Sequence, residues 1–138
     1  MKGIPYVNFN GNCEEAVRFY HSILGGELEL MRFKDIPEGG GMRPGGTWND
    51  KIMHGSLKFR GGNYLYFSDS WEENPVTVGS NVTVHLEVDS EKDVYTFVEK
   101  LGAGGKIQMP AAKVFWGSVY GSVVDRYGVS WGIEYPLG

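Results

Sequence analysis

His54 is the side chain of this sequence best suited to acid–base chemistry, because an imidazole titrates near neutral pH. It lies in an apolar-rich run, Ile52 to Phe59, that predicts a β-strand. A histidine there can act as a general base, although a lone histidine on a strand is more often a hydrogen-bonded structural residue. Cys13 opens a predicted helix whose dipole can lower a thiol pKa, but no catalytic partner is evident beside it. His54 is therefore the candidate catalytic residue, and Cys13 is treated as incidental.

Four aromatic residues are candidates for the wall of a ligand pocket, namely Trp48, Tyr66, Trp116 and Tyr120. Aromatic faces bind flat or apolar groups, and the polar edges of Trp and Tyr orient them. The competing interpretation is core packing, which accounts for most aromatic residues in small α+β domains. Both interpretations stay open for Trp48 and Trp116, whereas Trp131 is predicted to lie in the core.

Trp48 belongs to a glycine-rich segment, Asp35 to Asp50, which is longer than most connections in compact domains. Loops of this kind are often lids or binding loops. Arg43 in the same segment can meet an anionic substrate, although a solvated loop arginine is commoner.

Length and charge favour a single soluble domain over residues 1–138. The net charge is −4 and the 13 Lys and Arg residues form no basic run, which argues against nucleic acid or an anionic membrane as a partner. One cysteine excludes an internal disulfide, and the segment Met1 to Pro5 lacks the apolar core of a signal peptide. No segment reaches transmembrane length. We therefore expect a cytoplasmic protein.

The first half of the chain predicts a strand, a helix and three further strands. Its strands are expected at 4–9, 27–33, 52–59 and 64–68, the last two joined by a turn at Gly61-Gly62. Asn12 is the expected helix N-cap, with Glu15 three residues later. Gly25-Gly26 ends the helix. The apolar stripe of this helix comprises Ala16, Phe19, Tyr20, Ile23 and Leu24.

The second half repeats the same order. Ser90 is the expected cap of a second helix, which ends at the glycines between 102 and 105. Strands are expected at 82–88 and 106–109, followed by a hairpin that turns at Asp125-Arg126-Tyr127-Gly128.

The sequence therefore reads β-α-β-β-β twice, as module 1 (about residues 1–70) and module 2 (about residues 80–138) joined by a polar linker. Two such modules predict an α+β fold in which each twisted antiparallel sheet packs a helix on its outer face. The inner faces would enclose a cleft.

In its order of elements, its Phe19-Tyr20 before Gly25-Gly26 and its turn at residues 125–131, the chain resembles the vicinal oxygen chelate superfamily. That superfamily includes glyoxalase I, bleomycin-resistance proteins and extradiol dioxygenases. The segments 5–12, 67–69 and 115–117, together with His54, resemble its PhnB-like branch. The resemblance covers nearly the whole chain.

The resemblance implies four inward-facing metal ligands, usually His or Glu, one on each of four strands. Their positions fall within a residue or two of Pro5, Ser56, Thr83 and Gly132, none of which is a usual ligand. We therefore expect no metal and no other cofactor. Strand alternation places His54 beside Ser56, and places His85 and Glu87 beside Thr83. Together with Glu134 they form either a displaced metal site or, as we favour, polar groups lining a wet cleft.

Two classes of function remain. The first is a binding protein that holds a small molecule through His54, Ser56, Trp48, Tyr66, His85, Glu87, Trp116 and Tyr120. The second is an enzyme of lyase, isomerase or transferase type. Chains resembling this one often carry the label 3-demethylubiquinone methyltransferase, yet the glycine-rich segment 39–46 does not follow the βα pattern of a nucleoside-binding turn.

A homodimer is also implied, because chains of this superfamily commonly pair across a symmetric interface.

Overall fold

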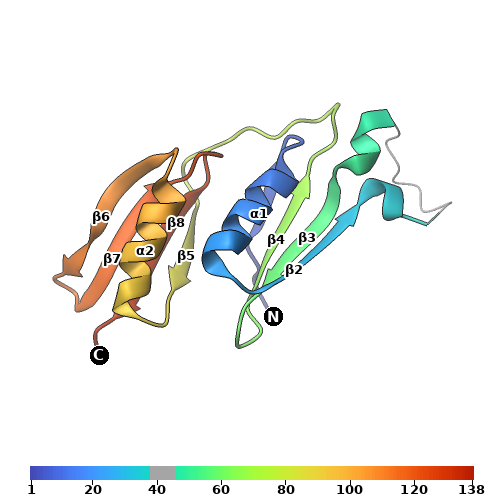
Figure 1. Cartoon of the computed structure of the whole chain (residues 1–138). Helices are drawn as coiled ribbons and strands as arrows, with labels where there is room; N and C mark the ends of the chain where they lie inside the picture. The colour runs from blue at the N-terminus through green and yellow to red at the C-terminus, as the bar shows by residue number, and fades with distance from the viewer. Residues whose placement is uncertain (38–45) are drawn as a thin grey trace. The chain divides into compact units, whose positions relative to one another are not determined.

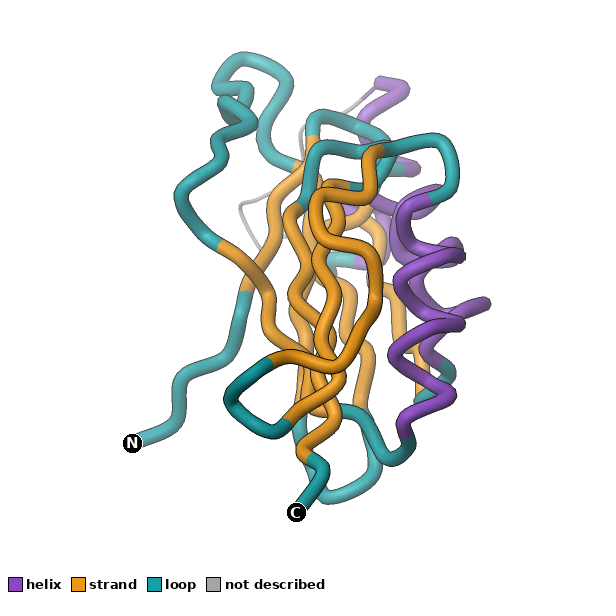
Figure 2. Tube along the Cα trace, turned by 90° about the vertical axis from the view of Figure 1, so that its left-hand side faces the viewer, coloured by secondary structure: helices purple, strands orange, loops and turns teal. Residues whose placement is uncertain are grey.

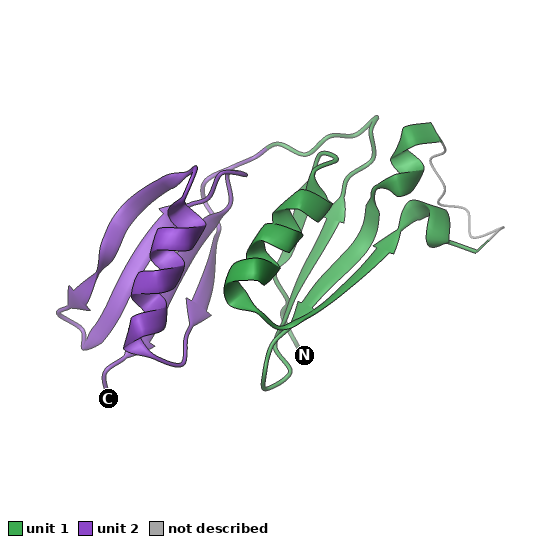
Figure 3. Cartoon of the chain, viewed as in Figure 1, with its two compact units in different colours: residues 1–77 green, residues 78–138 purple. Residues whose placement is uncertain are grey.

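The computed structural model describes residues 1–37 and 46–138, which form two compact units, 1–77 and 78–138 (Figure 3). The boundary lies inside the polar linker that the sequence predicts. The expected glycine-rich lid and Arg43 lie outside the described residues, apart from the ends of that segment. Within the described part of the chain, no helix is long and apolar enough to span a bilayer.

Unit 1 is a four-stranded sheet with one helix (Figure 1). The strand order is β1-β4-β3-β2, and two short 3-10 segments lie between β2 and β3. In chain order the elements are β1 (Tyr6–Phe9), α1 (Cys13–Leu24), β2 (Glu27–Arg32), η1 (Phe33–Asp35), η2 (Gly46–Asp50), β3 (Ile52–Lys58) and β4 (Tyr64–Asp69).

Unit 2 repeats this plan with the strand order β5-β8-β7-β6. Its elements are β5 (Thr83–Glu87), α2 (Glu91–Gly102), β6 (Lys106–Val114), β7 (Ser118–Val124) and β8 (Ser130–Pro136). The predicted β-α-β-β-β order and the α+β class are thus confirmed.

The expectation of wholly antiparallel sheets is wrong for one strand pair in each unit. β1 runs parallel to β4, and β5 runs parallel to β8. A helical crossover leaves β1 and β2 running in the same direction, and the antiparallel hairpins β2-β3-β4 bring β4 back to that direction. The sheets are therefore mixed.

Each helix lies along one face of its own sheet (Figure 2). In unit 1 the fully buried Ala16, Val17 and Tyr20 of α1 lie on the side of Leu57 and Phe67. In unit 2 the buried side chains are Val94, Val98 and Leu101 of α2, and Val119, Val123, Trp131 and Ile133 of the sheet. Removal of this apolar surface from water stabilises both units. Among the described elements, the opposite face of each sheet has no helix packed on it (Figure 2).

A helix-facing glycine allows close packing in the middle of each sheet. A methyl group on Gly121 of β7 would lie 2.6 Å from a methyl of Val98 and 3.1 Å from the Ala111 Cα. A methyl group on Gly55 of β3 would lie 2.9 Å from a terminal methyl of Leu30. The backbone neighbour of Gly121 cannot move as the end of a leucine side chain can.

The two helices are capped differently. The Ser90 hydroxyl accepts a hydrogen bond from the Asp93 amide at 3.1 Å, which confirms the predicted cap of α2. Asn12 precedes α1 but makes no side-chain cap. Asp69, at the end of β4, accepts from the amides of Gly11 at 2.8 Å and Cys13 at 2.9 Å instead. Its second oxygen accepts from the Ile52 amide at 2.9 Å, so one buried carboxylate joins three segments of unit 1.

Cys13 lies at this junction with no exposed surface. Burial raises the pKa of its thiol far above the usual range, and the nearby carboxylates of Asp69 and Glu14 raise it further. The thiol is therefore protonated and inaccessible in the folded unit.

A second buried aspartate organises the closing hairpin of unit 2. Asp125 accepts from the amides of Tyr127 at 2.8 Å and Val129 at 3.0 Å, and from the Trp131 indole at 2.8 Å. Gly128 has the positive φ of +86° that this turn requires. The predicted turn and the predicted core position of Trp131 are both confirmed.

Strand β6 is longer than the predicted segment 106–109 and continues through Pro110. A proline is tolerated there because β6 lies at the edge of its sheet, where an amide is not needed on both sides. The pairing with β7 shifts register between Ile107 and Met109 and again between Met109 and Ala112.

Candidate functional site

The helix-free side of the unit 1 sheet is a polar, aromatic face. Tyr66 of β4 pairs with Tyr6 of β1 on one side and with Ser56 of β3 on the other, so these three side chains share one face. His54, two residues before Ser56, lies on it too. We call Tyr6, His54, Ser56 and Tyr66 the tyrosine face.

The rings of the tyrosine face contact one another edge-on. The centroids of His54 and Tyr66 are 4.8 Å apart, and that of Tyr6 lies 5.8 Å from His54 and 5.9 Å from Tyr66. The Tyr6 hydroxyl lies 3.3 Å from Nδ1 of His54, a long hydrogen bond. These contacts hold three rings in fixed orientations on a face that α1 does not cover.

This arrangement resolves the register of the first strand. The sequence alone leaves two registers open, one with Pro5, Val7 and Phe9 facing the ligand side and one, shifted by a bulge, with Tyr6 and Asn8 facing it. Phe9 is buried and contacts Phe67 on the helix side, whereas Tyr6 is 47% exposed. Tyr6 and Asn8 are therefore the residues that face away from the helix, and the apolar character of Val7 and Phe9 was the signal that favoured this register.

Unit 2 carries a corresponding face with different chemistry. His85 and Glu87 of β5 pair with Gly132 and Glu134 of β8, and Tyr120 of β7 pairs with Glu134 from the other side. Trp116, in the turn between β6 and β7, donates its indole N–H to Glu134. We call His85, Glu87, Trp116, Tyr120 and Glu134 the glutamate face.

Glu134 lies at the centre of this face. Its Oε2 accepts from Trp116 Nε1 at 2.9 Å and its Oε1 lies 3.0 Å from His85 Nε2. Hydrogen bonds from Trp116, Ser118 and His85 hold the pKa of this carboxyl below its usual value, against a smaller opposing effect of burial. The carboxylate is therefore ionised at neutral pH, so His85 Nε2 must carry the hydrogen between them.

Gly132 leaves a small space between two polar side chains of this face. A methyl group built on Gly132 would lie 3.1 Å from His85 Nδ1 and 3.2 Å from the Tyr120 hydroxyl oxygen. The His85 and Tyr120 rings are stacked at 6.3 Å. Glycine therefore keeps this part of the face open.

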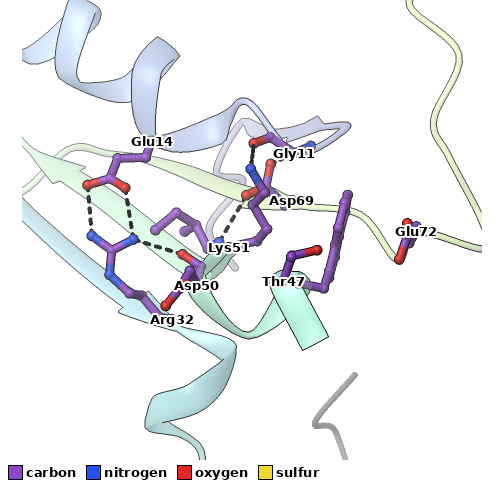
Figure 4. Close-up of a pocket in the computed structure, with 10 residues that line it drawn as sticks. Gly11, Glu14, Arg32, Thr47, Asp50, Lys51, Asp69 and Glu72 are labelled. Carbon is purple, nitrogen blue, oxygen red and sulfur yellow. Dashed lines mark hydrogen bonds and ion pairs between the residues drawn. The ribbon is translucent and has the colours of Figure 1, made fainter. Parts of the chain in front are cut away.

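Trp48 lies elsewhere, in a pocket of about 390 Å³ within unit 1 (Figure 4). Its indole N–H donates to the Ser70 carbonyl oxygen at 3.0 Å, and its ring lies beside Gly11. The other lining residues are Glu14, Arg32, Thr47, Asp50, Lys51, Ile52, Asp69 and Glu72.

Ion pairs form the opposite wall of this pocket. Arg32 donates to both carboxylate oxygens of Glu14, at 2.8 and 2.7 Å, and also to the Asp50 carbonyl oxygen at 2.8 Å. The hydrogen bonds from Arg32, assisted by Arg18, lower the pKa of Glu14 to about 2. Lys51 donates to the Gly11 carbonyl oxygen at 2.8 Å. The charged groups of this pocket are thus largely engaged in holding η2 and β2 against α1.

The eight predicted binding residues therefore fall into three places. His54, Ser56 and Tyr66 lie on the tyrosine face, and His85, Glu87, Trp116 and Tyr120 lie on the glutamate face. Trp48 lies in the separate pocket. The sequence did not identify the contact between Trp116 and Glu134, which joins residues 18 positions apart.

The metal implied by the superfamily does not fit the donor atoms at the expected positions. Pro5 and Gly132 have no side-chain donor, and the hydroxyls of Ser56 and Thr83 are weak ligands for a catalytic divalent ion. Across residues 1–37 and 46–138 there is no group of three or more His, Cys, Asp or Glu residues that could hold a metal ion.

Comparison with solved structures identifies the fold as that of glyoxalase/bleomycin resistance/dioxygenase proteins. Protein PA1353 from Pseudomonas aeruginosa is 36% identical with a TM-score of 0.84, over 99% of this chain and 98% of that chain. A PhnB protein from Bacillus cereus is 27% identical with a TM-score of 0.67, over 98% and 99% of the two chains. A family enzyme from Burkholderia phytofirmans PsJN, 15% identical with a TM-score of 0.64 over 99% and 100% of the two chains, shows the fold alone.

The family follows from sequence. A family model described as 3-demethylubiquinone-9 3-methyltransferase matches residues 1–134. Protein YjdN from Escherichia coli (strain K12) is 29% identical over 140 residues, 94% of this chain and 92% of that protein. The chain belongs to this PhnB-like family of the vicinal oxygen chelate superfamily.

Proposed function

We propose that this protein binds a small molecule through the tyrosine face of unit 1 and the glutamate face of unit 2. The observation that carries the proposal is the histidine on each helix-free face. Each is held by hydrogen bonds or ring contacts and stays partly accessible within its own unit. Binding needs no metal at the positions where the superfamily usually places one.

The physical support lies in the mixture of groups. Ligand sites combine apolar or aromatic walls with a few oriented polar atoms. Tyr6, Tyr66 and Tyr120 supply rings with hydroxyls, and His54 and His85 supply ring nitrogens.

A second candidate, an enzyme of lyase or isomerase type, is favoured by one contact. The hydrogen bond between His85 Nε2 and the Glu134 carboxylate fixes the ring and leaves Nδ1 to accept a proton. Methyl transfer, which the family description names, has less support. The β1–α1 connection has one glycine, and Asp69 already occupies the amides of Gly11 and Cys13 that could otherwise meet a cofactor.

The three histidines of the chain allow a direct test by NMR. His21 lies in the last turn of α1, with Nε2 3.1 Å from the Gly26 carbonyl oxygen, and serves as an internal control. A fragment library is screened for compounds that shift the ring signals of His54 or His85. We expect saturable shifts of at least one of these two with no shift of His21. A library in which no compound moves His54 or His85 would contradict the proposal.

The metal-free part of the proposal is tested by elemental analysis of untagged protein and by thermal-shift titration with Zn²⁺, Ni²⁺, Mn²⁺ and Fe²⁺. A ligand that binds only the folded state raises the melting temperature. We expect no stoichiometric metal and no shift. Stoichiometric metal that is lost in His54→Ala or Glu87→Ala would replace this reading by a displaced metal site.

The proposal also includes a cytoplasmic homodimer that does not bind nucleic acid, as the resemblance and the scattered charge imply. Light scattering at several protein concentrations tests the dimer, and cell fractionation tests the location.

A further inference from the structure

Two polar atoms border the small space above Gly132. They are Nδ1 of His85 and the hydroxyl oxygen of Tyr120, each within 3.2 Å of the place that a Gly132 methyl group would take. Within residues 1–37 and 46–138, no hydrogen bond engages either atom. Both atoms are therefore available to a group that enters this space.

Their hydrogen-bonding roles are complementary. His85 Nε2 donates to Glu134, so Nδ1 of the neutral ring is an acceptor. The Tyr120 hydroxyl can donate. A hydroxyl group matches this pair, because it can donate its hydrogen to Nδ1 while its oxygen accepts from Tyr120. A carbonyl oxygen could use only the tyrosine.

The surroundings favour a flat and uncharged body for the ligand. Trp116 is 50% exposed, and its indole N–H is fixed on Glu134, so the ring has a set orientation. Its centroid lies 5.8 Å from that of Tyr120 at an interplanar angle of 61°. The carboxylates of Glu134 and Glu87 repel an anion. An aromatic ring can lie against Trp116, whereas a carboxylic acid is disfavoured.

We propose that the glutamate face is a hydroxyl-recognition site, in which His85 Nδ1 and the Tyr120 hydroxyl bind the hydroxyl group of an uncharged aromatic ligand above Gly132. This inference rests on the proposed binding function and adds the chemical class of the ligand.

The test compares three probes, 4-methylphenol, its methyl ether 4-methylanisole, and 4-methylbenzoate, by titration against the His85 ring signal. We expect 4-methylphenol to shift His85 in a saturable way. The methyl ether cannot donate, so it should bind at least about fivefold more weakly, the loss of one hydrogen bond. The benzoate should leave His85 unshifted.

Two substitutions test whether the hydroxyl group of the ligand binds at this position. Tyr120→Phe keeps the ring and removes the donor, and it should weaken 4-methylphenol binding about fivefold. Gly132→Ala fills the space with a methyl group and should weaken it about tenfold or more. Gly79→Ala is the matched control, because a methyl group there meets only Asn81 Oδ1, at 3.8 Å. An unchanged NMR signal of the buried Trp131 indole N–H, which lies in unit 2, establishes that each variant is folded.

The outcomes separate this inference from the broader function. If 4-methylphenol and the methyl ether bind equally, or if Tyr120→Phe and Gly132→Ala bind as the wild type does, the hydroxyl site is wrong. If other fragments then still shift His85 or His54, the binding function survives without it. If no compound shifts either histidine, both proposals are wrong.

Discussion

The two units share a scaffold and differ in the chemistry of their helix-free faces. In each unit a helix covers one side of a four-stranded mixed sheet, and one buried aspartate ties a loop to the sheet. On the tyrosine face, however, the His54 ring contacts Tyr6 and Tyr66, whereas on the glutamate face His85 is bound to a carboxylate. The duplicated scaffold therefore does not determine what each face can do, and function has to be argued from the face residues.

The largest expected effect concerns the feature that both units share, a buried aspartate that accepts several hydrogen bonds. Asp69→Ala and Asp125→Ala each leave three buried or half-buried N–H donors without their acceptor. Each should destabilise its own unit by about 3 kcal/mol, since an unsatisfied buried donor costs its full desolvation. Amide hydrogen exchange measured unit by unit checks this. A loss below about 1 kcal/mol in either variant would show that the two aspartates are not equivalent.

Substitution of the helix-facing glycine should cost the two units different amounts of stability. Gly121→Ala places a methyl group against the Ala111 backbone and Val98, and should cost about 2 kcal/mol. Gly55→Ala meets the movable end of Leu30, and should cost about 1 kcal/mol or less. Urea denaturation of both variants measures the difference. Equal costs would contradict the distinction between a backbone neighbour and a flexible side chain.

Acid should weaken unit 1 through Glu14. Its pKa falls from 4.5 to about 2 on folding, so its ion pairs stabilise the unit fully above pH 4.5. That contribution is lost as the pH falls through about 2. Solvent screens this partly exposed group, so the loss should be about 1 kcal/mol.

Glu14→Gln should flatten the acid limb of the unit 1 stability curve, measured by urea denaturation at several pH values. The curve of unit 2 should be unaffected. An unchanged acid limb in the variant would remove Glu14 as its cause.

The smallest expected effect concerns Glu134, the carboxylate of the glutamate face that Trp116 and His85 hold by hydrogen bonds. Trp116→Phe keeps a ring but removes the principal donor to Glu134, so the pKa of that carboxyl should rise towards its ordinary value. Stability should change by less than about 1 kcal/mol, because this contact lies near the surface. A ¹³C titration of the glutamate carboxyls reads the pKa, and an unchanged value would mean that Ser118 and His85 hold it alone.

Local signals in the sequence predicted most of the scaffold. The Ser90 cap and the glycines at both hairpin turns are read from neighbouring residues, and the structure confirms them. The cap of α1 was different, because its acceptor is Asp69, which is 56 residues from Cys13 in the chain. Contacts of that range leave no periodic pattern in a single sequence.

The same limit applies to the candidate site. Alternation correctly grouped His54 with Ser56, and His85 with Glu87. It did not reveal that Trp116 and His85 meet on one carboxylate, because these residues come from a turn and two strands. The orientation of Tyr6 depended on the register of a strand of only four residues.

Burial of Cys13 gives this protein a built-in reporter. A thiol that is protonated and inaccessible in the folded state reacts with an alkylating reagent only when its unit opens. Since the chain has one cysteine, the labelling rate of the unmodified protein measures the opening of unit 1 without any engineered probe. A ligand that protects Cys13 must stabilise that unit, whereas one that acts on unit 2 alone leaves the rate unchanged.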